Sequence, residues 1–160
     1  MSGGSGFQRA VESTQNLESA YRSGKQALNT AAKTAVDHTG VALTGSIDLD
    51  DALATTHPND PRWDYGIAHV VDENSREFVT WIELHPATPG ETKSVVGKHD
   101  WLRSWLEADG RALRQFPCCS VWIATKGIGI PKNSPERRRL ALKGILGPCK
   151  HFRLRGSESS

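Results

Sequence analysis

The sequence predicts an α/β protein in which a mixed central sheet, containing a β-meander, is flanked by helices. Two apolar segments rich in β-branched and aromatic residues are separated by a short polar stretch, as in a β-hairpin. Segments with helical periodicity lie before and after this hairpin, and a further apolar strand follows the second of them. This order indicates a sheet covered by helices rather than a helical bundle or a β-sandwich.

The chain has the length of one ordinary domain, at 160 residues. We expect a flexible arm over residues 1–7, a single domain over residues 8–155 and a flexible tail over residues 156–160. No apolar run approaches the roughly 18 residues that a membrane span needs, and the N-terminus lacks the pattern of a secretion signal. A soluble, cytoplasmic protein without a membrane partner is therefore expected.

The N-terminal part is expected to be helical. Residues 8–36 contain no proline, and small or apolar residues recur there with a period near 3.6, which predicts one long amphipathic helix. Residues 41–49 have the composition of a short strand. A loop with two prolines and an Asn-Asp pair then continues to residue 61.

A β-hairpin forms the predicted centre of the sheet. Its strands are residues 62–71 and 76–85, joined by four residues of turn composition. Because side chains alternate along a strand, Asp64, Glu83 and His85 share one face. A turn centred between residues 73 and 74 places Asp64 opposite Glu83, whereas a turn at residues 74 and 75 places it opposite His85.

The second half of the chain alternates helix and strand again. A helix over residues 92–113 leads into an apolar strand over residues 120–125, so that this helix forms a crossover. Ser134, followed by proline and an acid, has the pattern of a helix start. A last extended piece is expected at residues 151–154.

The three cysteines do not indicate a disulfide framework, because they are odd in number and none lies in a C-x-x-C pair. Buried thiols are the favoured interpretation. A zinc ion held by Cys118, Cys119, Cys149 and His151 is the alternative, although adjacent ligands followed by a long gap are unusual for zinc.

Charge is divided unevenly along the chain. Residues 126–155 carry nine lysines and arginines against one acid, whereas the preceding residues are net acidic. Such a division is typical of a polyanion-binding edge on an acidic body, and a solvated helix face with a basic tail is the alternative. We expect nucleic acid as a partner and leave a homodimer open. The candidate nucleic-acid-binding residues are Lys126, Lys132, Arg137, Arg138, Arg139 and Lys143.

Two carboxylates close together repel one another unless a cation or a proton lies between them. Asp64 and Glu83 are therefore candidate ligands of Mg²⁺ or Mn²⁺, which prefer oxygen ligands. A metal there would polarise a phosphodiester and activate a bound water, which His85 would orient or deprotonate. A carboxylate-histidine pair that only satisfies hydrogen bonds near the end of a sheet is the structural alternative.

The order helix, β-meander, helix, strand, with Asp64 near the start of the second strand and Glu83-Leu84-His85 on the third, resembles the PD-(D/E)XK nuclease superfamily. The resemblance covers about residues 8–125 and implies a restriction-endonuclease-like fold. It also implies that Asp64 and Glu83 bind Mg²⁺ in a metal-dependent nuclease acting on DNA or RNA. The family has a lysine two places after the glutamate, where this chain has His85. A degenerate, non-catalytic module that binds nucleic acid or protein is therefore the alternative function.

Lys98 is the candidate replacement for that lysine. It shares the apolar stripe of its helix, so it is expected to face the sheet, unless it is a surface lysine whose stem packs on the core. Lys93 is nearer the sheet end. Weaker candidates for further site residues are Asp48, Asp50, Glu12 and Glu18. The five tryptophans lie in apolar periodic segments and are expected in the core.

Overall fold

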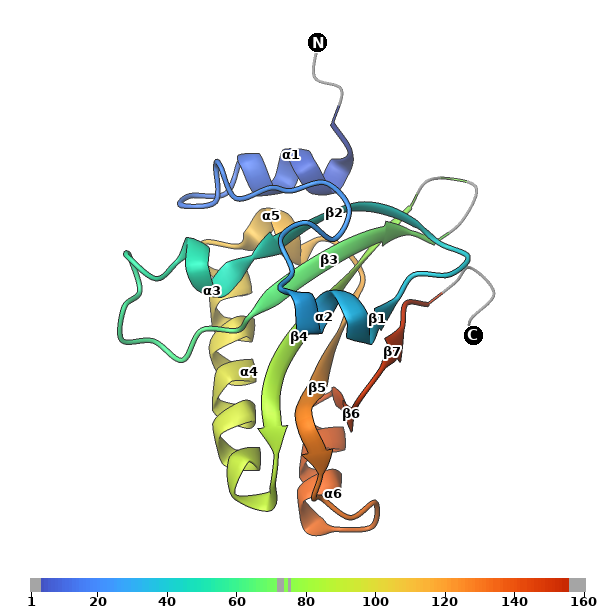
Figure 1. Cartoon of the computed structure of the whole chain (residues 1–160). Helices are drawn as coiled ribbons and strands as arrows, with labels where there is room; N and C mark the ends of the chain where they lie inside the picture. The colour runs from blue at the N-terminus through green and yellow to red at the C-terminus, as the bar shows by residue number, and fades with distance from the viewer. Residues whose placement is uncertain (1–3, 72–73, 75, 156–160) are drawn as a thin grey trace.

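A five-stranded mixed sheet organises the chain, and the computed structural model describes residues 4–71, 74 and 76–155 (Figure 1). The first three strands form an antiparallel meander, and the last two strands run parallel to the third. This arrangement confirms the expected α/β protein with a mixed sheet. In spatial order the strands are β2 (Ala42–Asp48), β3 (Tyr65–Val70), β4 (Glu77–Ala87), β5 (Cys118–Ile128) and β6 (Ile145–Cys149).

Helices cover both faces of the sheet. On one face lies the long helix α4, together with α1, α3 and α6, and this side holds the larger apolar core. The opposite face is covered by α2 and a two-stranded parallel sheet. The helices are α1 (Gly6–Glu12), α2 (Thr30–Ala35), α3 (Leu49–Ala52), η1 (Pro89–Glu91), α4 (Thr92–Glu107), α5 (Arg111–Arg114) and α6 (Pro135–Leu142), and the small sheet pairs β1 (Val36–Asp37) with β7 (Phe152–Arg153).

The register of the hairpin follows the first of the two expected alternatives. Tyr65 pairs with Ile82 and Gly66 pairs with Trp81, so that Asp64, just before β3, continues the ladder toward Glu83. The alternation of faces is also confirmed. Trp81 belongs to the core under α4, whereas Tyr65 and Ile82 belong to the core under α2.

The parallel half of the sheet differs from expectation in its extent. Strand β5 pairs in parallel with β4, which makes α4 the expected crossover, but β5 runs on to Ile128. Strand β6 was not expected, because Gly147 and Pro148 are typical of a turn. Their position is possible because β6 is an edge strand of the five-stranded sheet and, among the described residues, pairs with β5 alone.

The expected helix over residues 8–36 is wrong. Helix α1 ends at Glu12, where the hydroxyls of Ser13 and Thr14 both donate to the carbonyl of Ala10. Such side-chain bonds offer the backbone an alternative to the helix. Farther along, Arg22 forms an isolated bridge with Ser46 on β2, and helix α2 begins only at Thr30.

Helix α4 is also shorter than the expected helix over residues 92–113. It ends at Glu107, and a turn leads into α5. Gly110 lies so close to Trp105 that an added Cβ would be 2.6 Å from the indole ring. By contrast, the helix start at Ser134 is confirmed, because its side chain accepts a hydrogen bond from the backbone N–H of Arg137 at 3.2 Å.

The tryptophans behave largely as expected. Trp63, Trp81, Trp105 and Trp122 are buried, and Trp101 is partly buried with its indole N–H donating to Asp60. None of the helices within the described ranges is long and apolar enough to cross a membrane.

Gly66 allows the close contact between β3 and the ring of Trp81, since an added Cβ would lie 2.7 Å from that ring. We expect Gly66→Ala to lower the free energy of unfolding by about 1–3 kcal/mol. Gly97→Ala is the matched control, because nothing lies within 4 Å of its added Cβ. Inside a helix, alanine is more favourable than glycine by about 0.5–1 kcal/mol, so this variant should be more stable than the wild type. Urea unfolding of both variants measures the difference, and equal effects would contradict the explanation.

Candidate active site

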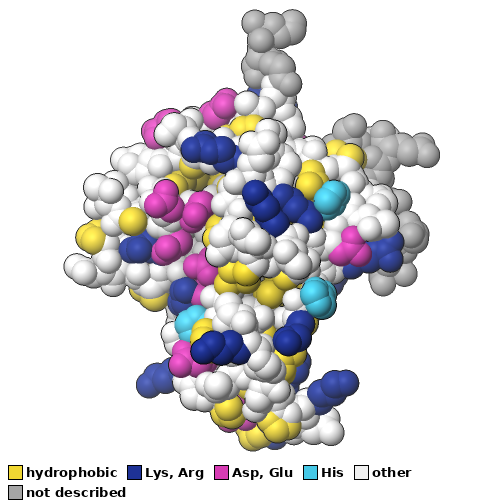
Figure 2. Space-filling view, in the orientation of Figure 1, with side chains coloured by type: hydrophobic (Ala, Val, Ile, Leu, Met, Phe, Trp, Pro, Cys, Tyr) yellow, Lys and Arg dark blue, Asp and Glu magenta, His cyan; other side chains and the backbone are white. Residues whose placement is uncertain are grey.

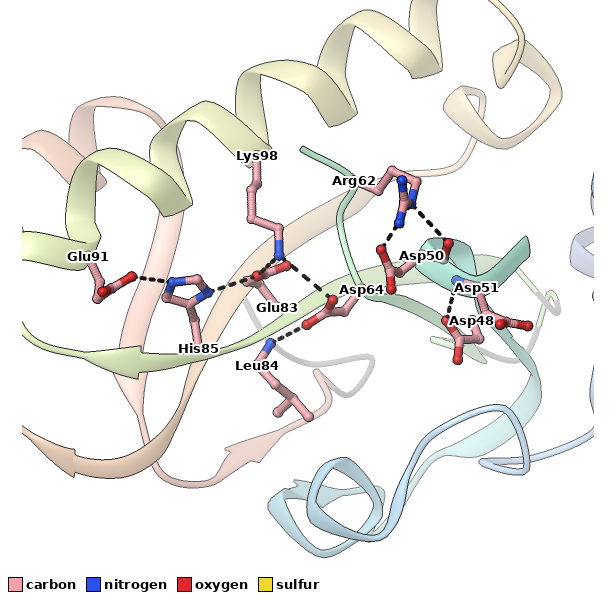
Figure 3. Close-up of polar contacts among 10 residues, drawn as sticks. All are labelled: Asp48, Asp50, Asp51, Arg62, Asp64, Glu83, Leu84, His85, Glu91 and Lys98. Carbon is pink, nitrogen blue, oxygen red and sulfur yellow. Dashed lines mark hydrogen bonds and ion pairs between the residues drawn. The ribbon is translucent and has the colours of Figure 1, made fainter. Parts of the chain in front are cut away.

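Four residues singled out in the sequence lie together between the sheet and α4 (Figure 3). Asp64 lies immediately before β3, Glu83 and His85 lie on β4, and Lys98 projects from α4 toward them. Alternation along β4 places Glu83 and His85 on the same side of the strand. The helical stripe of α4 turns Lys98 to that side as well.

Lys98 joins the two carboxylates. Its ammonium group forms an ion pair with Oε2 of Glu83 and lies 3.8 Å from Oδ1 of Asp64. The other oxygen of Asp64, Oδ2, accepts a hydrogen bond from the backbone N–H of Leu84 at 2.9 Å. Asp64 is therefore held by an N–H of β4 just beyond the last β3–β4 pair, with one oxygen turned to Lys98.

Glu83 is completely buried, with an exposed fraction of 0%. Its Oε2 faces both Lys98 and Nδ1 of His85, the latter at 3.3 Å. Its Oε1 has no hydrogen-bond partner within the described part of the chain. A buried carboxylate is costly unless cations and donors surround it, so Glu83 depends on its two basic neighbours.

Burial raises the pKa of the Asp64 carboxyl to about 7, and the nearby negative charge of Glu83 adds to this effect. The charge of Lys98 and the N–H of Leu84 act in the opposite direction. With a pKa of about 7, the Asp64 carboxyl changes between its protonated and its ionised form near neutral pH. A raised carboxyl pKa is the behaviour expected where two carboxylates lie close together in a largely buried site.

Glu91 is a member of the site that sequence reasoning missed. It ends η1, and its Oε1 lies 2.6 Å from Nε2 of His85, so the imidazole lies between Glu83 and Glu91. The hydrogen bond with Glu83 is the main cause that raises the pKa of His85 above its ordinary value. The imidazolium form is therefore favoured. The indole N–H of Trp122 also donates to the backbone carbonyl of His85 at 2.9 Å.

The weaker sequence candidates lie elsewhere. Asp48 caps α3, and Asp50 forms an ion pair with Arg62 at 3.0 Å, so both belong to a separate cluster in Figure 3. Glu12 accepts a hydrogen bond from Gln8 on α1. Glu18 and Lys93 have exposed side chains.

A divalent metal fits the site in a limited way. In the described ranges, no group of three or more His, Cys, Asp and Glu side chains is arranged to hold a metal ion. This finding gives no support to zinc at the cysteines, which are free thiols. The expectation of buried thiols is wrong for Cys118, which is exposed, and Cys119 and Cys149 are partly buried. Mg²⁺, however, keeps several waters and is often bound by one or two carboxylates. The two oxygens that already face a cation, Oε2 of Glu83 and Oδ1 of Asp64, meet that lower demand.

The basic segment, residues 126–155, is largely exposed around α6. Lys126, Lys132, Arg138 and Arg139 are exposed, and Arg137 is half-buried. Lys143 is half-buried and lies 3.4 Å from Asp100 of α4. Figure 2 shows acidic side chains gathered near the level of α3, whereas lysines and arginines are spread over this face of the molecule, including the end where Figure 1 places α6.

Comparisons of the chain with family models, with curated proteins and with solved structures gave no match. The function of the chain therefore has to be inferred from the geometry of its site and from the resemblance carried by its sequence.

Proposed function

We propose that this protein is a nuclease-like hydrolase that cleaves a phosphodiester bond in DNA or RNA with Mg²⁺ or Mn²⁺ at Asp64 and Glu83. The observation that carries the proposal is the contact of Lys98 with both carboxylates. The chain has His85 where the PD-(D/E)XK superfamily has its lysine. A lysine from the following helix supplies the ammonium group in its place.

The fold supports this proposal. The meander β2–β4 is followed by α4 and by β5, which is parallel to β4. Asp64 lies at the start of the second strand of the meander and Glu83 lies on the third. A restriction-endonuclease-like core has this order of elements, with its acidic residues at these places.

Each site residue has a chemical role in the proposed reaction. Asp64 and Glu83 would hold the metal, which when bound would act as a Lewis acid and lower the pKa of a bound water. Lys98 orients the attacking water or stabilises the negative charge that develops on the phosphate. His85, whose two ring nitrogens face Glu83 and Glu91, would hold the carboxylate of Glu83 in position. The basic segment binds the phosphate backbone.

Cleavage is tested with plasmid DNA, single-stranded DNA and RNA, each with Mg²⁺, with Mn²⁺ and with EDTA. We expect metal-dependent cleavage by the wild type and its loss in Glu83→Gln, which keeps the shape of the side chain and removes its charge. Glu107→Gln is the control, because Glu107 is an exposed acid at the end of α4. Cleavage that survives Glu83→Gln would show that another site is responsible.

A non-catalytic module that binds nucleic acid or protein is the second candidate. It is favoured by the lack of a third ligand among the described residues and by the ammonium group that already neutralises the carboxylates. Salt-sensitive binding without cleavage under any of the metal conditions would support this candidate. The homodimer stays a prediction.

The basic segment predicts a change in the salt dependence of binding. We expect the double variant Arg138→Gln, Arg139→Gln to reduce the slope of log K against log salt by about 1.4–1.8, because each lost phosphate contact contributes about 0.7–0.9. The control is Arg111→Gln with Arg114→Gln on α5, which removes the same charge from exposed positions outside the segment. Equal slopes for both double variants would contradict binding by α6.

A further inference from the structure

We propose that Lys98 is the resident cation of this site, and that a divalent metal binds only by displacing its ammonium group from Glu83 and Asp64. The inference rests on the metal site of the proposed function, but it does not require that the protein hydrolyses nucleic acid. In the absence of metal, Lys98 would occupy the position that a metal ion needs. The concentration of metal would then decide whether lysine or metal contacts the carboxylates.

The carboxylate oxygens that face a cation are the ones that Lys98 already uses. Oδ2 of Asp64 accepts the backbone N–H of Leu84, which leaves Oδ1 to face the ammonium group. Oε2 of Glu83 is shared by Lys98 and His85. The other oxygen of Glu83, Oε1, is buried out of contact with solvent. A divalent ion that contacts both acids therefore enters where the ammonium group now lies, between Oε2 of Glu83 and Oδ1 of Asp64.

Charge repulsion prevents the two cations from sharing this space. A divalent ion at hydrogen-bond distance from an ammonium group is strongly repelled where water is largely excluded. Glu83 is fully buried, and the side chains of Asp64 and Lys98 are only about one-fifth exposed. Screening by solvent is therefore weak, and occupation by lysine and by metal is mutually exclusive.

Lys98 is the cation that moves, and His85 is the one that stays. The imidazole is held on both sides, by Glu83 and by Glu91 at 2.6 Å, and its backbone carbonyl is bound by Trp122. Lys98 has a flexible four-carbon stem, and within the described residues its ammonium group is held by the two acids that the metal would take over. Once displaced, its ammonium group would be free to contact a phosphate group of the substrate.

The test is the affinity for Mn²⁺ alone, measured by isothermal titration calorimetry without nucleic acid. We expect Lys98→Met, which keeps an unbranched apolar stem and removes the charge, to bind Mn²⁺ at least about tenfold more tightly than the wild type. Lys93→Met is the matched control, since Lys93 is an exposed lysine on the same helix, and its affinity should stay within about twofold of the wild type. Equal or weaker binding by Lys98→Met would overturn the proposal.

Two further measurements cover a variant that folds poorly. Thermal unfolding with and without Mn²⁺ should show a larger stabilisation of Lys98→Met than of the wild type, because ligand binding stabilises the state that binds it. In the wild type, Mg²⁺ should shift the ammonium signal of Lys98 in NMR of ¹⁵N-lysine protein, assigned by its absence from the variant. A signal that stays unchanged while Mg²⁺ binds would refute displacement.

The outcomes separate this inference from the proposed function. Tighter Mn²⁺ binding by Lys98→Met without any cleavage by the wild type would retain the cation exchange and exclude the nuclease. Cleavage by the wild type, with equal Mn²⁺ affinity in both proteins, would retain the nuclease and exclude the exchange.

Discussion

Glu83→Leu is expected to lower the free energy of unfolding by about 3–5 kcal/mol, as is found when one partner of a buried ion pair is removed. Glu83 is fully buried, and its Oε2 is the shared acceptor of Lys98 and His85. Without this carboxylate, the partner that Lys98 retains among the described residues is the more distant Asp64, at 3.8 Å. The loss should therefore exceed what the volume of the side chain alone would cause.

A double-mutant cycle isolates the contribution of the pair. Lys98→Met should also destabilise the protein, and the variant with both substitutions should lose less than the sum, with an interaction of about 2–3 kcal/mol. Urea unfolding measures all four proteins. Lys143→Met serves as a comparison, because its ion pair with Asp100 is partly exposed and should contribute about 0–1 kcal/mol. Additive effects of the two substitutions would contradict a coupled pair.

The sequence predicted those site residues whose direction is set by the periodicity of a strand or a helix. Alternation along a strand brought Glu83 and His85 to one side of β4, and the pairing of β3 with β4 brought Asp64 to the same place. The 3.6-residue stripe of α4 turned Lys98 toward them. Each of these statements needs only local geometry and the pairing of two neighbouring strands, which a hairpin fixes.

Glu91 could not be found in this way. It lies in a proline-glycine turn between β4 and α4, where neither the period of two nor the period of 3.6 applies. Its role arises because the turn folds back over the end of β4 and brings its carboxylate to His85. An acid six residues after a site histidine, at the start of a helix, is a signal only when the turn geometry is known.

The differences between the predicted and the observed fold also arise where local periodicity does not decide the structure. The stripe of small residues in the N-terminal segment fits a helix, but Arg22 bonds to the edge of β2 and interrupts the segment. Strand β6, with Gly147 and Pro148, forms because β5 offers it an edge. Both outcomes depend on partners far away in the sequence, which overrule local propensity.

His99, the neighbour of Lys98 on α4, predicts a second large effect, on the pH dependence of stability. It is 5% exposed, its Nε2 lies 3.1 Å from the hydroxyl of Ser120, and its Nδ1 has no partner in the described part of the chain. Burial, aided by the charge of Arg103, lowers the pKa of His99 to about 4. The unfolded chain has an ordinary imidazole that takes up its proton near pH 6.5. Protons therefore bind preferentially to the unfolded state between these values.

The free energy of unfolding attributable to His99 should accordingly fall by about 3 kcal/mol as the pH falls from 6.5 to 4. Asp64 acts in the opposite direction over the same range, because a raised carboxyl pKa favours the folded state as the pH falls toward the ordinary value of that group. The wild-type curve alone mixes the two effects, so the difference between the wild type and His99→Gln has to be measured. That difference should decline steadily between pH 7 and pH 4 in urea unfolding, because glutamine does not titrate. A constant difference would mean that His99 has the same pKa in the folded and the unfolded protein, so that the burial of its ring does not exclude the charge.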